Sequence, residues 1–207
     1  MNNHFWWYVS RASGTVAWVL VLATCAWGIL LATRLFRGWD RPAWLLDLHR
    51  WLGSLLLAST ALHMLALVGD NYTHFTAAHL LVPFASTWKP GPVALGVVAF
   101  WMLAAVQATS WMMKKLPKRL WRGVHMLSYV AFVMVTWHAI AAGTDASSRW
   151  YGALTVAMVA LATAFGTARL ITLRAQPSRT TPRGSARIGL TSPDGEGKER
   201  EKTNVRA

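Results

Sequence analysis

Four histidines lie inside long apolar stretches or at their ends, where an ionisable side chain is costly and usually has a function. His49 and His63 are 14 residues apart, and His125 and His138 are 13 residues apart. At a rise of 1.5 Å per residue, these separations correspond to about 21 Å and about 20 Å along a helix axis. Each pair therefore places one imidazole near either end of a membrane-crossing helix.

Imidazoles at matched depths on two helices are suited to axial ligation of a heme iron, because each ring supplies one nitrogen on one side of the porphyrin. If both helices cross the membrane in the same direction, His49 faces His125 and His63 faces His138. The spacing therefore predicts two sites and two hemes. The directions of the side chains around the helix axis are a difficulty. Two residues 14 positions apart point within about 40° of each other, whereas two residues 13 positions apart point about 140° apart. The second helix then needs tilt, curvature or a bulge.

Two other interpretations of these histidines stay open. Buried histidines also form hydrogen bonds between membrane helices, as they would in a non-redox transporter or a structural membrane protein. Zinc is a poorer candidate, because each site has only two histidines and Cys25 is the only thiol of the chain. A tetrahedral zinc site needs more ligands than that, and no Asp or Glu lies within the uncharged stretches.

Five uncharged stretches are long enough to position the histidines in a membrane. Each has 19 to 23 residues, close to the roughly 20 that cross about 30 Å of hydrocarbon. They cover residues 12–33, 51–69, 91–113, 123–144 and 150–168. With 54% hydrophobic and 14% charged residues, the chain is not an ordinary soluble domain. We predict an all-α, polytopic membrane helical bundle with about five transmembrane helices, in which residues 71–88 form a surface loop or a re-entrant segment.

The net charge of +13 indicates membrane orientation rather than nucleic-acid binding. The connections on one side of the predicted spans contain 18 Lys and Arg residues, and those on the other side contain 3. Basic residues near span ends mark the cytoplasmic side. We therefore predict an outside N-terminus and a cytoplasmic C-terminus, with membrane lipid and no nucleic acid as a partner. The expected location is the cell membrane, with the bacterial inner membrane favoured.

The composition changes after residue 174. Residues 175–207 are rich in Ser, Thr, Pro, Gly and charged residues and contain few large apolar ones. Such a segment cannot bury enough surface to fold. We predict a transmembrane domain over residues 1–174 and a disordered, basic cytoplasmic tail over residues 175–207.

Two motifs around the histidines resemble the ferric reductase-like transmembrane domain family, shared by ferric reductases, NADPH oxidases and the heme-binding subunit of methionine-sulfoxide reductase systems. The first motif reads Leu-His-Arg-Trp-Leu-Gly over residues 48–53 and continues to Leu-His at 62–63. The second reads Leu-Pro at 116–117, Trp-Arg-Gly-Val-His-Met-Leu-Ser-Tyr over 121–129, and Trp-His at 137–138. The resemblance covers roughly residues 12–173, although family members commonly have six spans rather than five.

The resemblance implies two b-type hemes, one ligated by His49 and His125 and the other by His63 and His138. It also implies electron transport across the bilayer by the membrane subunit of an oxidoreductase. In ferric reductases and NADPH oxidases a flavin and nicotinamide module follows the last helix. No glycine-rich dinucleotide motif follows the last predicted span of this chain. We therefore expect a separate flavin reductase or quinol as the electron donor.

Basic and aromatic residues beside the histidines have two interpretations. Arg50 and Arg122 lie within three residues of His49 and His125, and they are candidate counter-charges for anionic heme propionates. The tendency of arginine to flank membrane helices on the cytoplasmic side would place them there as well. Trp51, Trp121 and Trp137 adjoin or nearly adjoin histidines, but interfacial tryptophan belts are the favoured explanation.

The predicted outer loop at residues 70–79 follows His63 closely and is the candidate surface for an electron acceptor. It contains His74 and His79, which are five residues apart and so do not share one face of a helix. A solvated loop without a binding role is the alternative.

Overall fold

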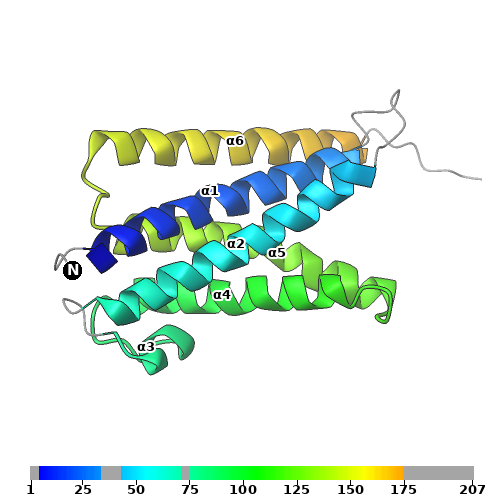
Figure 1. Ribbon diagram of the computed structural model, residues 1–207. Coiled ribbons are helices and arrows are strands. Elements are labelled where there is room, and N and C mark those ends of the chain that lie inside the picture. Colours follow the sequence, from blue (N-terminus) through cyan, green and yellow to red (C-terminus); the bar gives the residue numbers. More distant parts are fainter. Residues whose placement is uncertain (1–4, 34–42, 71–74, 175–207) are drawn as a thin grey trace, which may run out of the picture. The chain divides into compact units, whose positions relative to one another are not determined.

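The computed structural model describes residues 5–33, 43–70 and 75–174, and these residues form six α-helices without any strand (Figure 1). The helices are α1 (Phe5–Thr33), α2 (Ala43–Gly69), α3 (Ala77–Leu81), α4 (Pro90–Trp111), α5 (Lys118–Ala142) and α6 (Arg149–Arg174). All of them except α3 are long and apolar enough to cross a membrane. The predicted all-α bundle with five transmembrane helices is therefore confirmed. The predictions for residues 175–207 and for His74 lie outside the described residues.

Four of the five long helices are longer than the uncharged stretches from which they were predicted, whereas α4, with 22 residues, is one residue shorter than its stretch. α1 begins at Phe5 and α2 begins at Ala43, whereas the sequence criterion stopped at the charged residues Arg11 and Arg50. A charged residue near the end of a span is tolerated because its long side chain can reach the polar interface. His49 consequently lies well inside α2 rather than at its start.

The connection between α2 and α4 is described from Phe75 onward and contains the short helix α3. Phe75 and Leu80 are buried together with Val93 and Val97 of α4. A helix of five residues is far too short to span the hydrocarbon core. The segment predicted as a surface loop or re-entrant piece thus includes a short helix that packs on the bundle, which the sequence analysis did not predict.

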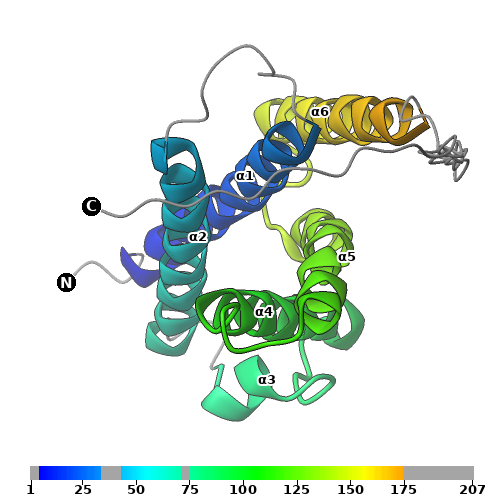
Figure 2. The same cartoon turned by 90° about the vertical axis from the view of Figure 1, so that its right-hand side faces the viewer.

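Helix α1 is the most buried of the five long helices. It contacts α2, α5 and α6, while α4 contacts α5, α2 and α3, and Figure 2 shows α1, α2, α4 and α5 arranged in a ring with α6 beside α1. Trp18 and Val21 of α1 are almost completely buried. The two histidine-bearing helices, α2 and α5, are not among the helix pairs in extensive contact. They face each other across the ring, so a group held between them would not have to displace a helix–helix interface.

Hydrogen bonds between helices hold this arrangement together in a part of the molecule where lipid offers no partners. The indole Nε1 of Trp18 donates to Oγ1 of Thr136 in α5 over 3.0 Å. The hydroxyl of Ser59 in α2 donates to the backbone carbonyl of Ser13 over 2.9 Å, and the hydroxyl of Tyr151 in α6 donates to the carbonyl of Ala139 over 2.8 Å. These bonds connect α1 to α5, α2 to α1 and α6 to α5.

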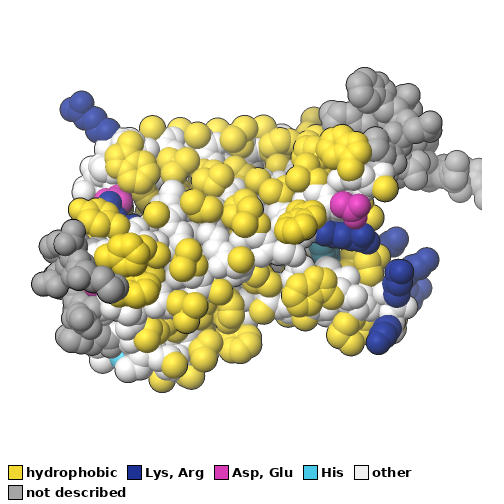
Figure 3. Space-filling view, viewed as in Figure 1, with side chains coloured by type: hydrophobic (Ala, Val, Ile, Leu, Met, Phe, Trp, Pro, Cys, Tyr) yellow, Lys and Arg dark blue, Asp and Glu magenta, His cyan; other side chains and the backbone are white. Residues whose placement is uncertain are grey.

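The surface follows the pattern of a membrane protein. Figure 3 shows apolar side chains over the flanks of the long helices, whereas Lys and Arg gather at the end where α4 meets α5. That connection and the first turns of α5 contain Lys114, Lys115, Lys118, Arg119 and Arg122. An apolar flank of this extent is suited to contact with lipid. The chain is a multi-pass membrane protein.

Candidate functional site

The first histidine pair lies toward the basic end of the bundle, and we call it the basic-end pair. The ring centroids of His49 in α2 and His125 in α5 are 6.0 Å apart, with an angle of 62° between the ring planes. A metal–imidazole bond of about 2 Å on each side, plus roughly 1 Å from nitrogen to ring centre, puts the centroids of two axial ligands about 6 Å apart. The observed separation fits one metal atom between the rings.

Among the described residues, three buried nitrogens of the basic-end pair and its neighbourhood have no hydrogen-bond partner: Nδ1 of His49, Nδ1 of His125 and Nε1 of Trp121. The His49 ring does approach the backbone carbonyl of Thr24, but outside hydrogen-bond geometry. Trp121 stacks on His125, with ring centroids 5.2 Å apart and planes within 27°. Buried unpaired polar groups are rare and point to a missing partner. A ligand with polar groups would satisfy them.

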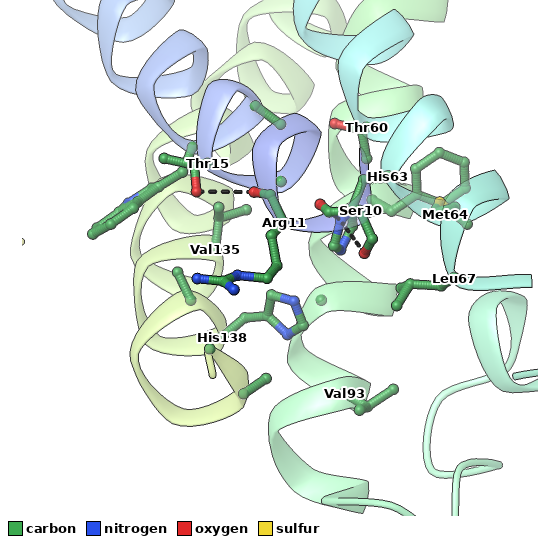
Figure 4. Close-up of a pocket in the computed structure, with 18 of the residues that line it drawn as sticks. Ser10, Arg11, Thr15, Thr60, His63, Met64, Leu67, Val93, Val135 and His138 are labelled. Atoms are coloured by element: carbon green, nitrogen blue, oxygen red, sulfur yellow. Dashed lines mark hydrogen bonds between the residues drawn. The ribbon is translucent and has the colours of Figure 1, made fainter. Parts of the chain in front are cut away.

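The second pair, His63 and His138, lies at the opposite end, and we call it the far-end pair. The two side chains come from α2 and α5 and line the same cavity (Figure 4). Nδ1 of His63 is 2.7 Å from the backbone carbonyl oxygen of Ser10, and Nδ1 of His138 is 2.8 Å from that of Pro92. A carbonyl can only accept, so Nδ1 carries the proton in both rings. In a neutral imidazole, Nε2 is then the free ligating nitrogen.

Glycines lie against three of the four rings. A Cβ atom built on Gly14 would stand 2.8 Å from Nδ1 of His63, and one built on Gly96 would stand 2.8 Å from Nδ1 of His138. At Gly28 the nearest atom would be Cε1 of His49, at 3.2 Å. The helix backbone therefore forms a seat for each of these imidazoles, and at two of the seats a side chain would collide with the ring.

The cavity at the far end has a volume of about 260 Å³. This exceeds the roughly 150 Å³ of an engineered cavity that accepts benzene. Its walls are apolar over α1, α2, α4 and α5 and include Leu56, Val97 and Leu103. A mostly apolar pocket with a few convergent polar groups is the usual form of a cofactor site.

One cationic group enters this cavity. Arg11 of α1 forms an ion pair with Asp145 in the connection between α5 and α6. Its guanidinium carbon also lies 4.0 Å from the ring centroid of Trp7, within the range of a cation–π contact. Arg11 stands just before an uncharged stretch, where the sequence alone does not distinguish it from an ordinary helix-flanking arginine.

The two arginines that the sequence singled out have a different environment. Arg50 is more than half exposed and pairs with Asp47 of its own helix over 3.1 Å. Arg122 is exposed near the start of α5. Both lie at the basic end, and neither lines the cavity that holds the far-end pair. Their role as propionate counter-charges stays a prediction.

The predicted tryptophan belt separates into two kinds of residue. Trp51 is 73% exposed and Trp137 is 63% exposed, as expected for aromatic side chains that face lipid or its interface. Trp121 instead packs on a candidate ligand.

His79 of the candidate acceptor loop lies in α3, where its ring is 6.0 Å from that of Phe75.

The rotational difficulty in α5 has a simple resolution. α5 is an uninterrupted α-helix from Lys118 to Ala142, so no bulge turns the second ring inward. His125 faces His49 of α2, whereas His138 turns toward α4, where it meets Pro92 and Gly96. The 13-residue spacing therefore suits a helix whose two histidines contact different neighbouring helices, α2 for His125 and α4 for His138.

The donor set suits a group larger than a bare ion. Among the described residues, no cluster of three or more His, Cys, Asp or Glu side chains is placed to hold a metal. Each pair offers two imidazoles and nothing further, which is the axial set of a heme whose porphyrin supplies the other four nitrogens. The ring separation at the basic end fits such a group, and the far-end pair lines one mostly apolar cavity.

A comparison with protein families identifies one match. Residues 10–136, more than half of the chain, match the family described as "Ferric reductase like transmembrane component". The matched region contains His49, His63 and His125 and ends two residues before His138. No curated protein and no solved structure matches the chain.

Proposed function

Because the chain belongs to the ferric reductase-like transmembrane family, a family of membrane electron-transfer proteins, we propose that it is a diheme b-type protein. In this proposal it carries electrons across the bilayer as the membrane subunit of an oxidoreductase. The observation that supports the proposal most strongly is the pairing of histidines from α2 and α5 at two depths. Heme iron with two axial histidines accepts and releases one electron at a time.

The residues of the chain hold and orient the group. In this proposal His49 and His125 hold one heme at the basic end, and His63 and His138 hold the other at the far end. The carbonyls of Ser10 and Pro92 fix the far-end rings with Nε2 free, and fixing the tautomer in this way also raises the basicity of the ligand. The far-end cavity surrounds its two histidines mainly with apolar side chains.

We assign the basic end to the cytoplasm, because of the distribution of Lys and Arg. Electrons then enter at the basic-end pair from a separate flavin reductase or from quinol, and leave at the far end. The acceptor surface in this proposal is the connection between α2 and α4, whose described part includes His79 and packs against α4.

The test of the pairing is a set of four single substitutions. His49→Ala and His125→Ala should each remove the same heme, and His63→Ala and His138→Ala the other one, because a six-coordinate site needs both axial nitrogens. Low-temperature absorption and electron paramagnetic resonance spectra separate the two groups. Spectra that group His49 with His63 would contradict the cross-helix assignment. Normal absorption spectra in all four variants would favour histidines that only bond between helices.

The test of direction uses right-side-out and inside-out vesicles. A membrane-impermeant oxidant should oxidise the prereduced protein quickly only from the outer side. Equal rates from both sides would contradict the direction while leaving the ligands untouched. Labelling with an impermeant maleimide, at single cysteines introduced in place of Lys115 and Ser147 in a Cys25→Ala background, checks the orientation independently. Position 147 should react in right-side-out vesicles and position 115 should not.

A further inference from the structure

Gly14 and Gly96 lie where the rings of His63 and His138 approach the backbone most closely. A Cβ at Gly14 would be 2.8 Å from Nδ1 and 3.0 Å from Cε1 of His63. A Cβ at Gly96 would be 2.8 Å from both Cε1 and Nδ1 of His138. Real Cβ atoms essentially never come within 3.0 Å of such neighbours. Any side chain at these two positions would push the ring away.

The carbonyls that receive the two rings are each four residues earlier on the same helix. Ser10 precedes Gly14 by four residues, and Pro92 precedes Gly96 by four. In an α-helix the carbonyl of residue i−4 points at the N–H of residue i, and the Cβ of residue i leans back toward that carbonyl. With each ring placed as it is here, a Cβ on residue i would crowd the imidazole that approaches this carbonyl.

We propose that Gly14 and Gly96 are positioning residues that seat the far-end histidines on the carbonyls of Ser10 and Pro92 and so fix Nε2 as the ligating atom. The proposal rests on the function proposed above and concerns how its ligands are held. On α1 and again on α4, the glycine and the carbonyl four residues before it together hold one imidazole ring.

The basic-end pair provides an internal comparison. Gly28 follows Thr24 by the same four residues, but a Cβ there would stand 3.2 Å from Cε1 of His49, and Nδ1 of His49 has no partner in hydrogen-bond geometry among the described residues. No glycine of the described residues lies against His125, whose Nδ1 is also unpaired. The backbone therefore fixes the far-end rings more strictly than the basic-end rings.

The effects of alanine substitutions on heme binding should differ between the two ends in the same way. Gly14→Ala and Gly96→Ala should weaken binding at the far end, by the roughly 10- to 100-fold typical of a lost partner of a ligand. Gly28→Ala should have a smaller effect, confined to the basic end. Gly91→Ala on α4 and Gly123→Ala on α5 are matched controls, because nothing lies within 4 Å of a Cβ at either position.

Three measurements are made on the full chain. Heme content is measured by the pyridine hemochrome assay. The midpoint potentials of the two hemes are measured in samples that retain both, and a far-end ligand that has lost its carbonyl should be less basic and raise the potential of that heme. In the heme-free protein, the ¹⁵N chemical shifts of histidine identify the tautomer. Wild-type His63 and His138 should both carry the proton on Nδ1.

The expected result is selective loss or a raised potential of the far-end heme in Gly14→Ala and Gly96→Ala, with the controls unchanged. Unchanged far-end binding and potential in both variants would overturn the proposal, as would equal loss at both ends. If a variant fails to accumulate, the wild-type tautomers still decide: protons on Nε2 of His63 and His138 would overturn it. Absence of heme from the wild-type chain would instead contradict the proposed function, while the tautomers would still test the seats.

Discussion

The bond between Trp18 and Thr136 is the best place to test how the ligand-bearing helix α5 is fixed. Trp18 is 1% exposed and Thr136 is 8% exposed, and the indole N–H donates to the threonine hydroxyl over 3.0 Å. That hydroxyl in turn donates to the carbonyl of Phe132 over 2.8 Å, so it both accepts and donates a hydrogen bond. α5 buries only Ala131 and Thr136. α5 also packs along α4, and the bond to Trp18 is a buried side-chain hydrogen bond between α5 and α1.

Thr136→Val keeps the shape and removes the acceptor, leaving a buried indole N–H unpaired. Such a loss costs about 1–3 kcal/mol in soluble proteins, whereas hydrogen bonds between membrane helices average about 0.6 and reach about 1.7 kcal/mol. We expect a loss of about 1 kcal/mol, roughly a fivefold change in the unfolding equilibrium. Thr136→Ser keeps the hydroxyl and is the control.

The assay is reversible unfolding in mixed detergent micelles with increasing dodecyl sulfate, followed by circular dichroism. A double-mutant cycle with Trp18→Phe isolates the pair, because the loss of indole volume enters both arms of the cycle. The coupling energy should be about 0.6–1.7 kcal/mol. A coupling energy below about 0.3–0.5 kcal/mol, the range within which independent sites add, would show that this bond does not fix α5.

Three further outcomes are expected. Trp121→Ala should perturb the spectrum of the basic-end heme and Trp51→Ala should not, because only Trp121 stacks on His125. The same heme spectrum in both variants would mean that the stacking does not affect the ligand. Arg11→Gln should destabilise the chain by less than about 1 kcal/mol, because its ion pair with Asp145 is partly exposed; a loss above about 2 kcal/mol would show that Arg11 has a larger structural role. Withholding heme should speed hydrogen exchange in α5 more than in α1, since α5 buries few residues of its own; equal protection would indicate that α5 does not depend on a bound group.

The sequence was sufficient to predict the membrane bundle and its five long helices, because apolar length is a direct requirement of the hydrocarbon core. It underestimated the helices where Arg11 and Arg50 interrupt the uncharged stretches. It also did not predict α3, because five residues around His79 carry too little periodicity to identify a helix. Whether Leu80 packs on α4 depends on contacts between distant parts of the chain.

The candidate site was only partly visible in the sequence. The histidine spacing predicted that His49 would face His125, and the structure brings these rings together. The seats were missed, although Gly14 and Gly28 are 14 residues apart, the same separation as His49 and His63. That match was the available signal. Contacts with the carbonyls of Ser10 and Pro92 carry no side-chain signature at all, so only a structure could locate them.

The most direct test of the account is the heme content of the purified chain. The protein is expressed with ample heme supply, purified in mild detergent, and assayed by pyridine hemochrome against protein concentration from amino-acid analysis. We expect two hemes b per chain, with spectra of six-coordinate low-spin iron. A heme content near zero in a folded, helical protein would show that the chain is not a diheme protein.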